Sequence, residues 1–200
     1  MSGVPQERSF RILSLNLPTS SQSPACPANP ANPESERRLV GLAPVFDSRA
    51  RLLVLGSFPG AASLQAAQYY AHPRNAFWPL MAALIGEVDL ATRPYAERLQ
   101  ALRQHRVALW DAVAACRREG SLDTAIEDVE PSDLKELVAR LPGLRVIGCN
   151  GALAHHQALA ALGEPGLPVL RLPSTSPAHA GMRLADKIEA WRGALARYLA

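Results

Sequence analysis

The chain has 200 residues, of which 48% are hydrophobic and 20% charged, a composition typical of a soluble globular protein with one domain of ordinary size. No apolar run approaches the ~18–20 residues of a membrane-spanning helix, and residues 12–17 are too short and too polar for the core of a signal peptide. We therefore expect a cytoplasmic protein with no membrane partner. The net charge is +3, and every basic residue except Lys135 and Lys187 is an arginine, which permits a nucleic-acid partner without requiring one.

The three cysteines, at positions 26, 116 and 149, show no Cys-x-x-Cys spacing and are odd in number, which favours a reducing compartment. They are too few for the four thiolates of an ordinary iron–sulfur cluster. His155 and His156 lie near Cys149, but neighbouring side chains on a helix diverge by ~100°, so this group does not form a zinc site. We expect no metal.

Composition divides the chain into two parts. Residues 1–38 are rich in Ser, Pro and Asn, which predicts a disordered tail, and residues 39–200 form the folded domain. Short apolar runs predict strands at 51–55, 107–110, 145–149 and 169–172, and helices are predicted at 75–85, 94–104, 131–140, 152–162 and 184–199. This alternation predicts an α/β fold with a parallel sheet that helices cover on both faces.

Three loops follow predicted strands, at 56–70, 111–121 and 173–181. Because the carboxyl ends of parallel strands share one edge of the sheet, residues of these loops converge on one pocket. The first loop opens with Gly56 and Gly60, and then gathers aromatic rings, a guanidinium and an amide. Such flat groups suit a flat ligand such as a nucleobase. Phe77 and Trp78 are neighbours at the start of a helix, so we expect one to face the core and the other to be free for a ligand.

The motifs Gly-Ser-Phe-Pro-Gly at 56–60 and Gln-Tyr-Tyr-Ala-His-Pro-Arg-Asn-Ala-Phe-Trp-Pro-Leu-Met at 68–81 resemble the uracil-DNA glycosylase superfamily. They are most similar to its hypoxanthine-DNA (deoxyinosine) glycosylase branch, as are the stretches 109–123 and 172–178, and the similarity runs from about 45 to 198. The resemblance implies a three-layer α/β/α sandwich with a four-stranded parallel sheet. It also implies hydrolysis of the N-glycosidic bond of a deaminated base in double-stranded DNA, without metal or cofactor, leaving an abasic site.

The resemblance also implies residue roles. Gly56, Ser57 and Phe58 match the water-activating loop, where mismatch-type relatives carry an asparagine at the position of Phe58. A phenyl ring cannot hold a water, so Asn75 becomes the catalytic candidate, holding the water or the leaving base; its alternative role is helix capping. Phe77 matches the ring that stacks on the flipped base, with a place in the core as its alternative.

Two further regions receive roles. Asp111 follows the second predicted strand, where relatives read the base, and its carboxylate can accept N1–H of hypoxanthine or N3–H of uracil; it can equally cap a helix. Ser174, Thr175 and Ser176 match the loop that enters the minor groove and contacts phosphates, and His179 is a further candidate for the same cleft.

Other functions stay open. The first is a mismatch-specific uracil glycosylase, against which Phe58 counts, and the second is a lesion-binding protein of the same fold without turnover. A small-molecule hydrolase would require a nucleophile and base, and no Gly-x-Ser-x-Gly motif occurs. Because Lys135 and Lys187 fall on predicted helices, outside the three loops, we expect a monofunctional enzyme without lyase activity. We expect it to be a monomer, with hypoxanthine first among its bases and uracil or xanthine as further ones.

Overall fold

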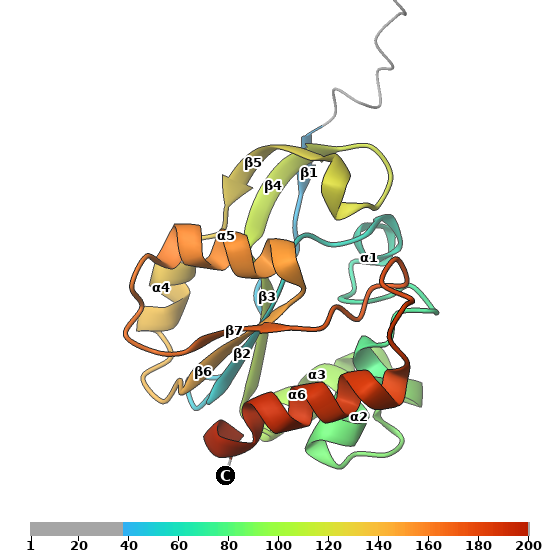
Figure 1. The fold of residues 1–200 in the computed structure, drawn as a ribbon, viewed down its shortest axis with the longest axis vertical. Helices are drawn as coiled ribbons and strands as arrows, with labels where there is room; N and C mark the ends of the chain where they lie inside the picture. Colours follow the sequence, from blue (N-terminus) through green and yellow to red (C-terminus); the bar gives the residue numbers. More distant parts are fainter. Residues whose placement is uncertain (1–37, 200) are drawn as a thin grey trace, which may run out of the picture. The chain divides into compact units, whose positions relative to one another are not determined.

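The computed structural model describes residues 38–199. Its centre is a four-stranded parallel sheet in the order β3–β2–β6–β7 (Figure 1), formed by β3 (Val107–Asp111), β2 (Leu52–Gly56), β6 (Val146–Asn150) and β7 (Val169–Leu172). The predicted sheet is confirmed. The predicted tail lies outside the described residues, except for Arg38, which begins strand β1 (Arg38–Val40).

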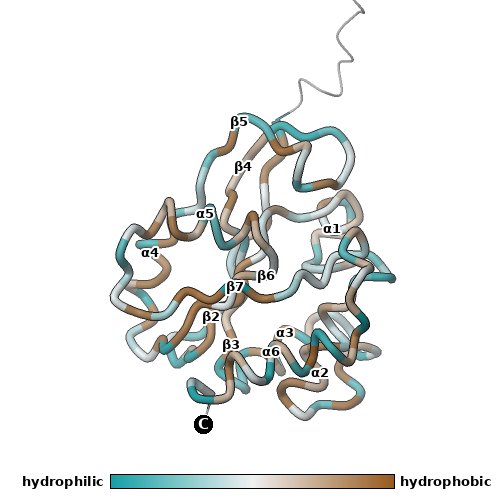
Figure 2. Tube along the Cα trace, in the orientation of Figure 1, coloured by the Kyte–Doolittle hydropathy of each residue, from teal (hydrophilic) through white to brown (hydrophobic). Residues whose placement is uncertain are grey.

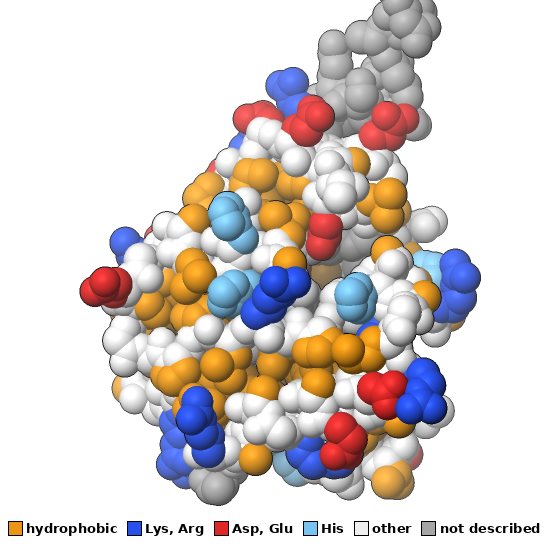
Figure 3. All heavy atoms as spheres, in the orientation of Figure 1, with side chains coloured by type: hydrophobic (Ala, Val, Ile, Leu, Met, Phe, Trp, Pro, Cys, Tyr) orange, Lys and Arg blue, Asp and Glu red, His pale blue; other side chains and the backbone are white. Residues whose placement is uncertain are grey.

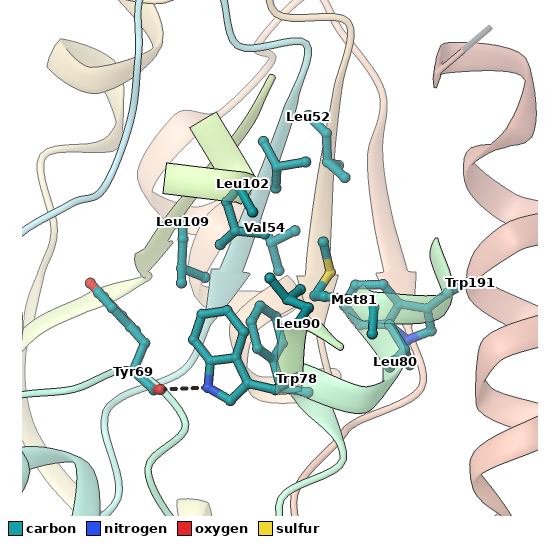
Figure 4. Close-up of a cluster of buried hydrophobic side chains, with 14 of the residues drawn as sticks. Leu52, Val54, Tyr69, Trp78, Leu80, Met81, Leu90, Leu102, Leu109 and Trp191 are labelled. Atoms are coloured by element: carbon teal, nitrogen blue, oxygen red, sulfur yellow. Dashed lines mark hydrogen bonds between the residues drawn. The ribbon is translucent and has the colours of Figure 1, made fainter. Parts of the chain in front are cut away.

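Helices cover both faces of this sheet, as Figure 1 shows. On β2, whose residues are all buried and, from Leu52 to Leu55, strongly hydrophobic (Figure 2), successive side chains point to opposite faces. Leu52 and Val54 pack with α2 (Phe77–Ile85), α3 (Tyr95–Gln104) and α6 (Leu184–Leu199), and Figure 4 shows this cluster. Leu53 and Leu55 pack with α4 (Leu134–Ala139) and α5 (Ala152–Leu162) on the other face. The predicted three layers are therefore present.

A second, antiparallel sheet was not predicted. Its order is β1–β4–β5, with β4 spanning Val113–Arg118 and β5 spanning Ile126–Pro131. The prediction placed a loop at 111–121 and a helix from 131, but only Ala112 separates β3 from β4, and α4 starts only at Leu134. The alanine-rich start of β4 carries little strand preference by itself, so its pairing with β1 and β5 determines its conformation.

Short helical segments complete the fold: α1 (Ala61–Ala66) and the 3-10 turns η1 (Leu90–Thr92) and η2 (Asp123–Ala125). α1 follows the Gly-Ser-Phe-Pro-Gly turn directly and was not predicted. Within residues 38–199, no helix is both long enough and apolar enough to cross a membrane.

Candidate active site

A cavity of about 260 Å³ lies at the carboxyl edge of the parallel sheet. All four strands contribute to it, because Gly56, Asp111 and Asn150 end β2, β3 and β6, and Ser174 follows β7. Pockets for drug-sized ligands have volumes of about 300–1,000 Å³, so this cavity suits a smaller ligand, of the size of a single base. The other residues lining it are Ser57, Phe58, Pro59, Gly60, Ala61, Ala62, Ser63, Tyr69, Tyr70, His72, Asn75, Ser121, Leu122, Asp123, Ser176, Pro177 and Ala178.

Gly56 is needed where the backbone approaches a carboxyl group. A Cβ at this position would lie 2.2 Å from Oδ1 of Asp111 and 3.1 Å from the hydroxyl oxygen of Tyr70. Real Cβ atoms do not come so close to an oxygen, so any larger residue would displace Asp111. The glycine therefore allows the Asp111 carboxyl to lie against the end of β2.

Asp111 is a buried carboxyl group without a full set of partners. The residue is 3% exposed, and its Oδ2 has no hydrogen-bond partner among residues 38–199. Burial, and then the negative charge of Asp123, raise its pKa to about 7, while the nearby Arg118 guanidinium acts in the opposite direction. The residue lines the cavity, and its carboxyl group changes charge near neutral pH.

Contacts of Ser57 and Phe58 fix the position of the Gly-Ser-Phe-Pro-Gly loop. The Ser57 hydroxyl donates to Oδ1 of Asp123 at 2.7 Å. The ring of Phe58 is 6% exposed and packs on Val113, and the Arg118 guanidinium lies 5.0 Å from its centroid. Both Ser57 and Phe58 line the cavity, but their contacts indicate that they also anchor the loop.

Asn75 lies in the cavity wall, and its side chain also binds the start of α2, whose N-cap is Ala76. Its Oδ1 accepts a hydrogen bond from the backbone N–H of Phe77 at 3.0 Å, at the start of α2. Because the oxygen is occupied, the NH₂ group is what the amide offers to a ligand. His72 was not predicted as a site residue, although it stands in the same motif. Its Nδ1 accepts from the N–H of Arg74 at 3.1 Å, which leaves Nε2–H of the neutral ring as a donor.

The structure corrects the role predicted for Phe77. Phe77 is fully buried and does not line the cavity, and Trp78, at 4% exposure, is buried as well. Both rings find space because Trp78 packs on the sheet, where its indole N–H donates to the carbonyl of Tyr69 (Figure 4), while Tyr70 covers Phe77. The rings of Tyr70 and Phe77 stack with centroids 3.8 Å apart, and Tyr70 lines the cavity.

Asn150 connects Tyr70 to the loop after β7. Its Nδ2 donates to the Tyr70 hydroxyl at 3.1 Å and to Oγ1 of Thr175 at 2.8 Å, and its Oδ1 accepts from the Thr175 N–H at 2.8 Å. The next residue, Gly151, at a φ of 110°, is the N-cap of α5. Thr175 is 1% exposed, and its hydroxyl oxygen and N–H are both bound to Asn150, so its predicted contact with DNA stays a prediction.

Ser174 and Ser176 line the cavity, and the Ser174 hydroxyl oxygen accepts from the Ser176 N–H at 3.2 Å. His179 is exposed and is not part of the cavity wall. Within the described part of the chain, no three His, Cys, Asp or Glu side chains gather as metal ligands would.

Comparison with known proteins agrees with this geometry. Residues 43–195 match the model of the uracil DNA glycosylase superfamily. The chain belongs to this superfamily. It is 42% identical over 111 residues to a hypoxanthine DNA glycosylase of Methanosarcina barkeri (strain Fusaro / DSM 804), covering 56% of this chain and 70% of the relative. It is 38% identical over 139 residues to a hypoxanthine DNA glycosylase of Methanosarcina acetivorans, covering 70% of this chain and 87% of that relative.

The fold is also that of a known superfamily structure. The solution NMR structure of a Methanosarcina acetivorans protein, described as a candidate uracil DNA glycosylase, matches with a TM-score of 0.69 and 34% identity, covering 78% of this chain and 98% of the other. The predicted resemblance to the superfamily, and to its hypoxanthine branch, is confirmed.

Proposed function

We propose that this protein is a monofunctional DNA glycosylase that removes a deaminated base, hypoxanthine in deoxyinosine first, from double-stranded DNA. Uracil and xanthine are further candidate bases. The observation that carries the proposal is the cavity at the strand ends, which brings Tyr70, Asn75 and Asp111 together. Superfamily membership and the relatives named hypoxanthine DNA glycosylase support it. We further propose that it acts as a monomer.

In this proposal Asp111 reads the edge of the base that deamination changes. Asp111 lines the cavity, and its carboxyl group, when ionised, accepts N1–H of hypoxanthine or N3–H of uracil. Adenine and cytosine carry a lone pair at the corresponding ring nitrogen and would face the carboxylate oxygen with no proton between them. The contact therefore favours deaminated bases over their parents.

The flipped base stacks on Tyr70. Phe77 supports this ring from behind, and the hydrogen bond from Asn150 fixes its hydroxyl. A base that leaves the helix loses stacking on its neighbours, and an aromatic ring in the pocket restores part of that energy.

Asn75 assists departure of the base. Cleavage of a glycosidic bond passes through an oxocarbenium-like sugar, and negative charge develops on the leaving base. The NH₂ of Asn75 is held in place because its oxygen is bound to the Phe77 N–H. It can donate to the departing base or position the attacking water, a role for which Phe58 has no polar group.

A lyase reaction would need an amine beside the sugar. The Lys187 ammonium donates to the carbonyl of His179 at 2.9 Å, and the residue is not part of the wall of this cavity. This supports a monofunctional enzyme, whose product is an intact strand with an abasic site.

The test is incubation of duplexes carrying hypoxanthine, uracil or xanthine opposite each normal base, followed by hot alkali. Cleavage at hypoxanthine that depends on alkali supports the proposal. Cleavage at uracil alone would identify a mismatch-type uracil glycosylase, and tight binding to the damaged duplex without cleavage would identify a lesion-binding protein. Cleavage without alkali would contradict the monofunctional assignment.

A further inference from the structure

A second cavity of about 260 Å³ adjoins the base cavity, and Ser176 and Pro177 line both. It is also lined by two basic residues, Arg74 and Lys187, and by Leu184, the first residue of α6. Basic side chains lie at several places on the face shown in Figure 3, some beside acidic side chains and some without an acidic neighbour. The second cavity brings two basic residues together.

Lys187 carries the strongest argument. The residue is only 4% exposed, although lysine is rarely buried without an anionic partner. Among residues 38–199, the hydrogen-bond partner of its ammonium is the carbonyl oxygen of His179, and no carboxylate pairs with it. An ammonium has three N–H donors, so two remain for a ligand in the cavity. Burial lowers the pKa of this lysine, which an anion bound beside it would counteract.

The other walls also favour an anion. Arg74 is exposed and forms no ion pair within the described part of the chain, so its guanidinium is available. α6 is 16 residues long, and the first N–H groups of a helix have no partner inside the helix. The acidic residue in its first turn, Asp186, is held by two hydrogen bonds from Arg183 and is not part of the cavity wall.

We propose that this second cavity binds one phosphodiester group of the DNA strand, within a few nucleotides of the flipped base. The inference rests on the proposed function, since the shared wall at Ser176 and Pro177 places the two cavities side by side. Arg74 and Lys187 contact the same phosphate, which fixes the position of the strand and reads no base. Lys187 also holds the loop that carries Ser174 and Ser176, through the His179 carbonyl.

The first test measures affinity for a duplex with a tetrahydrofuran abasic analogue, which no glycosylase can hydrolyse, at several salt concentrations. Arg74→Ala and Lys187→Met should each lower the slope of log K against log salt by about 0.9 or less, and at 50 mM salt weaken binding several-fold. In the double variant the slope should fall by no more than the value for one phosphate contact, about 0.9. Each variant should lose the same fraction of its affinity for an undamaged duplex as for the duplex with the abasic analogue. Matched controls are Arg103→Ala and Lys135→Met, which replace exposed cations elsewhere and should leave the slope unchanged.

The second test places a neutral methylphosphonate at single positions around the abasic analogue. At one position it should weaken binding by the wild type but not by Arg74→Ala or Lys187→Met, because these variants have already lost the contact. Arg74 is exposed, so its variant keeps the test valid if Lys187→Met unfolds. Unchanged slopes in Arg74→Ala, or a methylphosphonate effect equal in all proteins, would overturn the inference. Failure of the proposed function would appear separately, as a wild type that binds these duplexes but releases no base.

Discussion

The ring of Tyr70 stacks on the ring of Phe77 with centroids 3.8 Å apart and an angle of 19° between their planes. The buried phenyl ring thus acts on the cavity through its neighbour, and the tyrosine presents the aromatic surface to a ligand. Tyr70 adopts a positive φ of 54°, which is uncommon for a residue with a side chain and places the ring over Phe77.

Replacing Tyr70 should therefore separate stacking from hydrogen bonding. Tyr70→Ala should lower kcat/KM on a deoxyinosine duplex by about 10- to 100-fold, because base–aromatic stacking contributes about 1–3 kcal/mol. Tyr70→Phe keeps the ring and loses only the bond from Asn150, so its loss should be clearly smaller. Single-turnover kinetics check both, and an equal loss in the two variants would show that the hydroxyl, rather than the stacked ring, matters.

Asn75 should be essential for release and dispensable for binding. Asn75→Ala should slow single-turnover release of the base by about 10²–10³-fold, the usual effect of deleting one donor to a developing anion. Its affinity for damaged duplex should stay close to that of the wild type.

Loss of the α2 cap complicates Asn75→Ala, and Asn75→Asp is its matched control. Aspartate keeps an oxygen for the Phe77 N–H but removes the NH₂ donor. It should release base as slowly as the alanine variant while unfolding at a temperature nearer that of the wild type. Near-wild-type release by Asn75→Asp would assign the residue to capping alone.

Asp111 should give the protein an inverted dependence of stability on pH. Its pKa is about 7 in the folded protein, above the ordinary 3.8, so between these values the native state holds a proton that the unfolded chain has lost. The free energy of unfolding should therefore fall as pH rises from about 4 to 7, by up to about 4 kcal/mol for this group. Urea unfolding of wild type and Asp111→Asn across this range checks it, and parallel curves for the two proteins would contradict it.

The same carboxyl should matter for choice of base. Asp111→Ala should lower kcat/KM for deoxyinosine by about 10- to 100-fold, since a hydrogen bond to a charged group contributes about 1.5–3 kcal/mol. Competition assays against undamaged duplex measure the effect on selectivity. A variant with unchanged selectivity would remove Asp111 from base reading.

Gly56→Ala should act through Asp111. The new Cβ would lie 2.2 Å from Oδ1 of Asp111. Side chains and backbone would have to shift to make room for it, which lowers the free energy of unfolding by about 1–3 kcal/mol. Asp111→Ala should partly restore stability to Gly56→Ala, because it removes the atom in conflict. Thermal unfolding of the two single variants and the double variant forms the cycle, and strictly additive losses would argue against this contact.

The sequence predicts the parallel sheet well because its strands are short apolar runs. β7 was predicted with its observed limits, and β2, β3 and β6 differ by one residue at the ends. Asp111, at the carboxyl edge, could be identified in the same way, since parallel strands bring that edge together, whereas Asn75 was indicated by the motif that resembles the superfamily. β4 and β5 could not, because their conformation depends on pairing with each other and with β1.

The side-chain surroundings that motif spacing could not predict share a cause. The partners of Thr175 depend on Asn150, 25 residues earlier, which binds both its hydroxyl oxygen and its N–H. Whether Phe77 meets a base depends on Tyr70, whose positive φ turns its ring over the phenyl group. Motif spacing shows which residues lie near a site, but contacts such as these decide which of them reach the ligand.

The central claim is tested most directly by chromatography of the small molecules released from a deoxyinosine duplex by the wild type under single-turnover conditions. The account predicts free hypoxanthine in amounts equal to the abasic sites formed, with the strand intact until alkali is added. Stable binding of the duplex without any free hypoxanthine would contradict it.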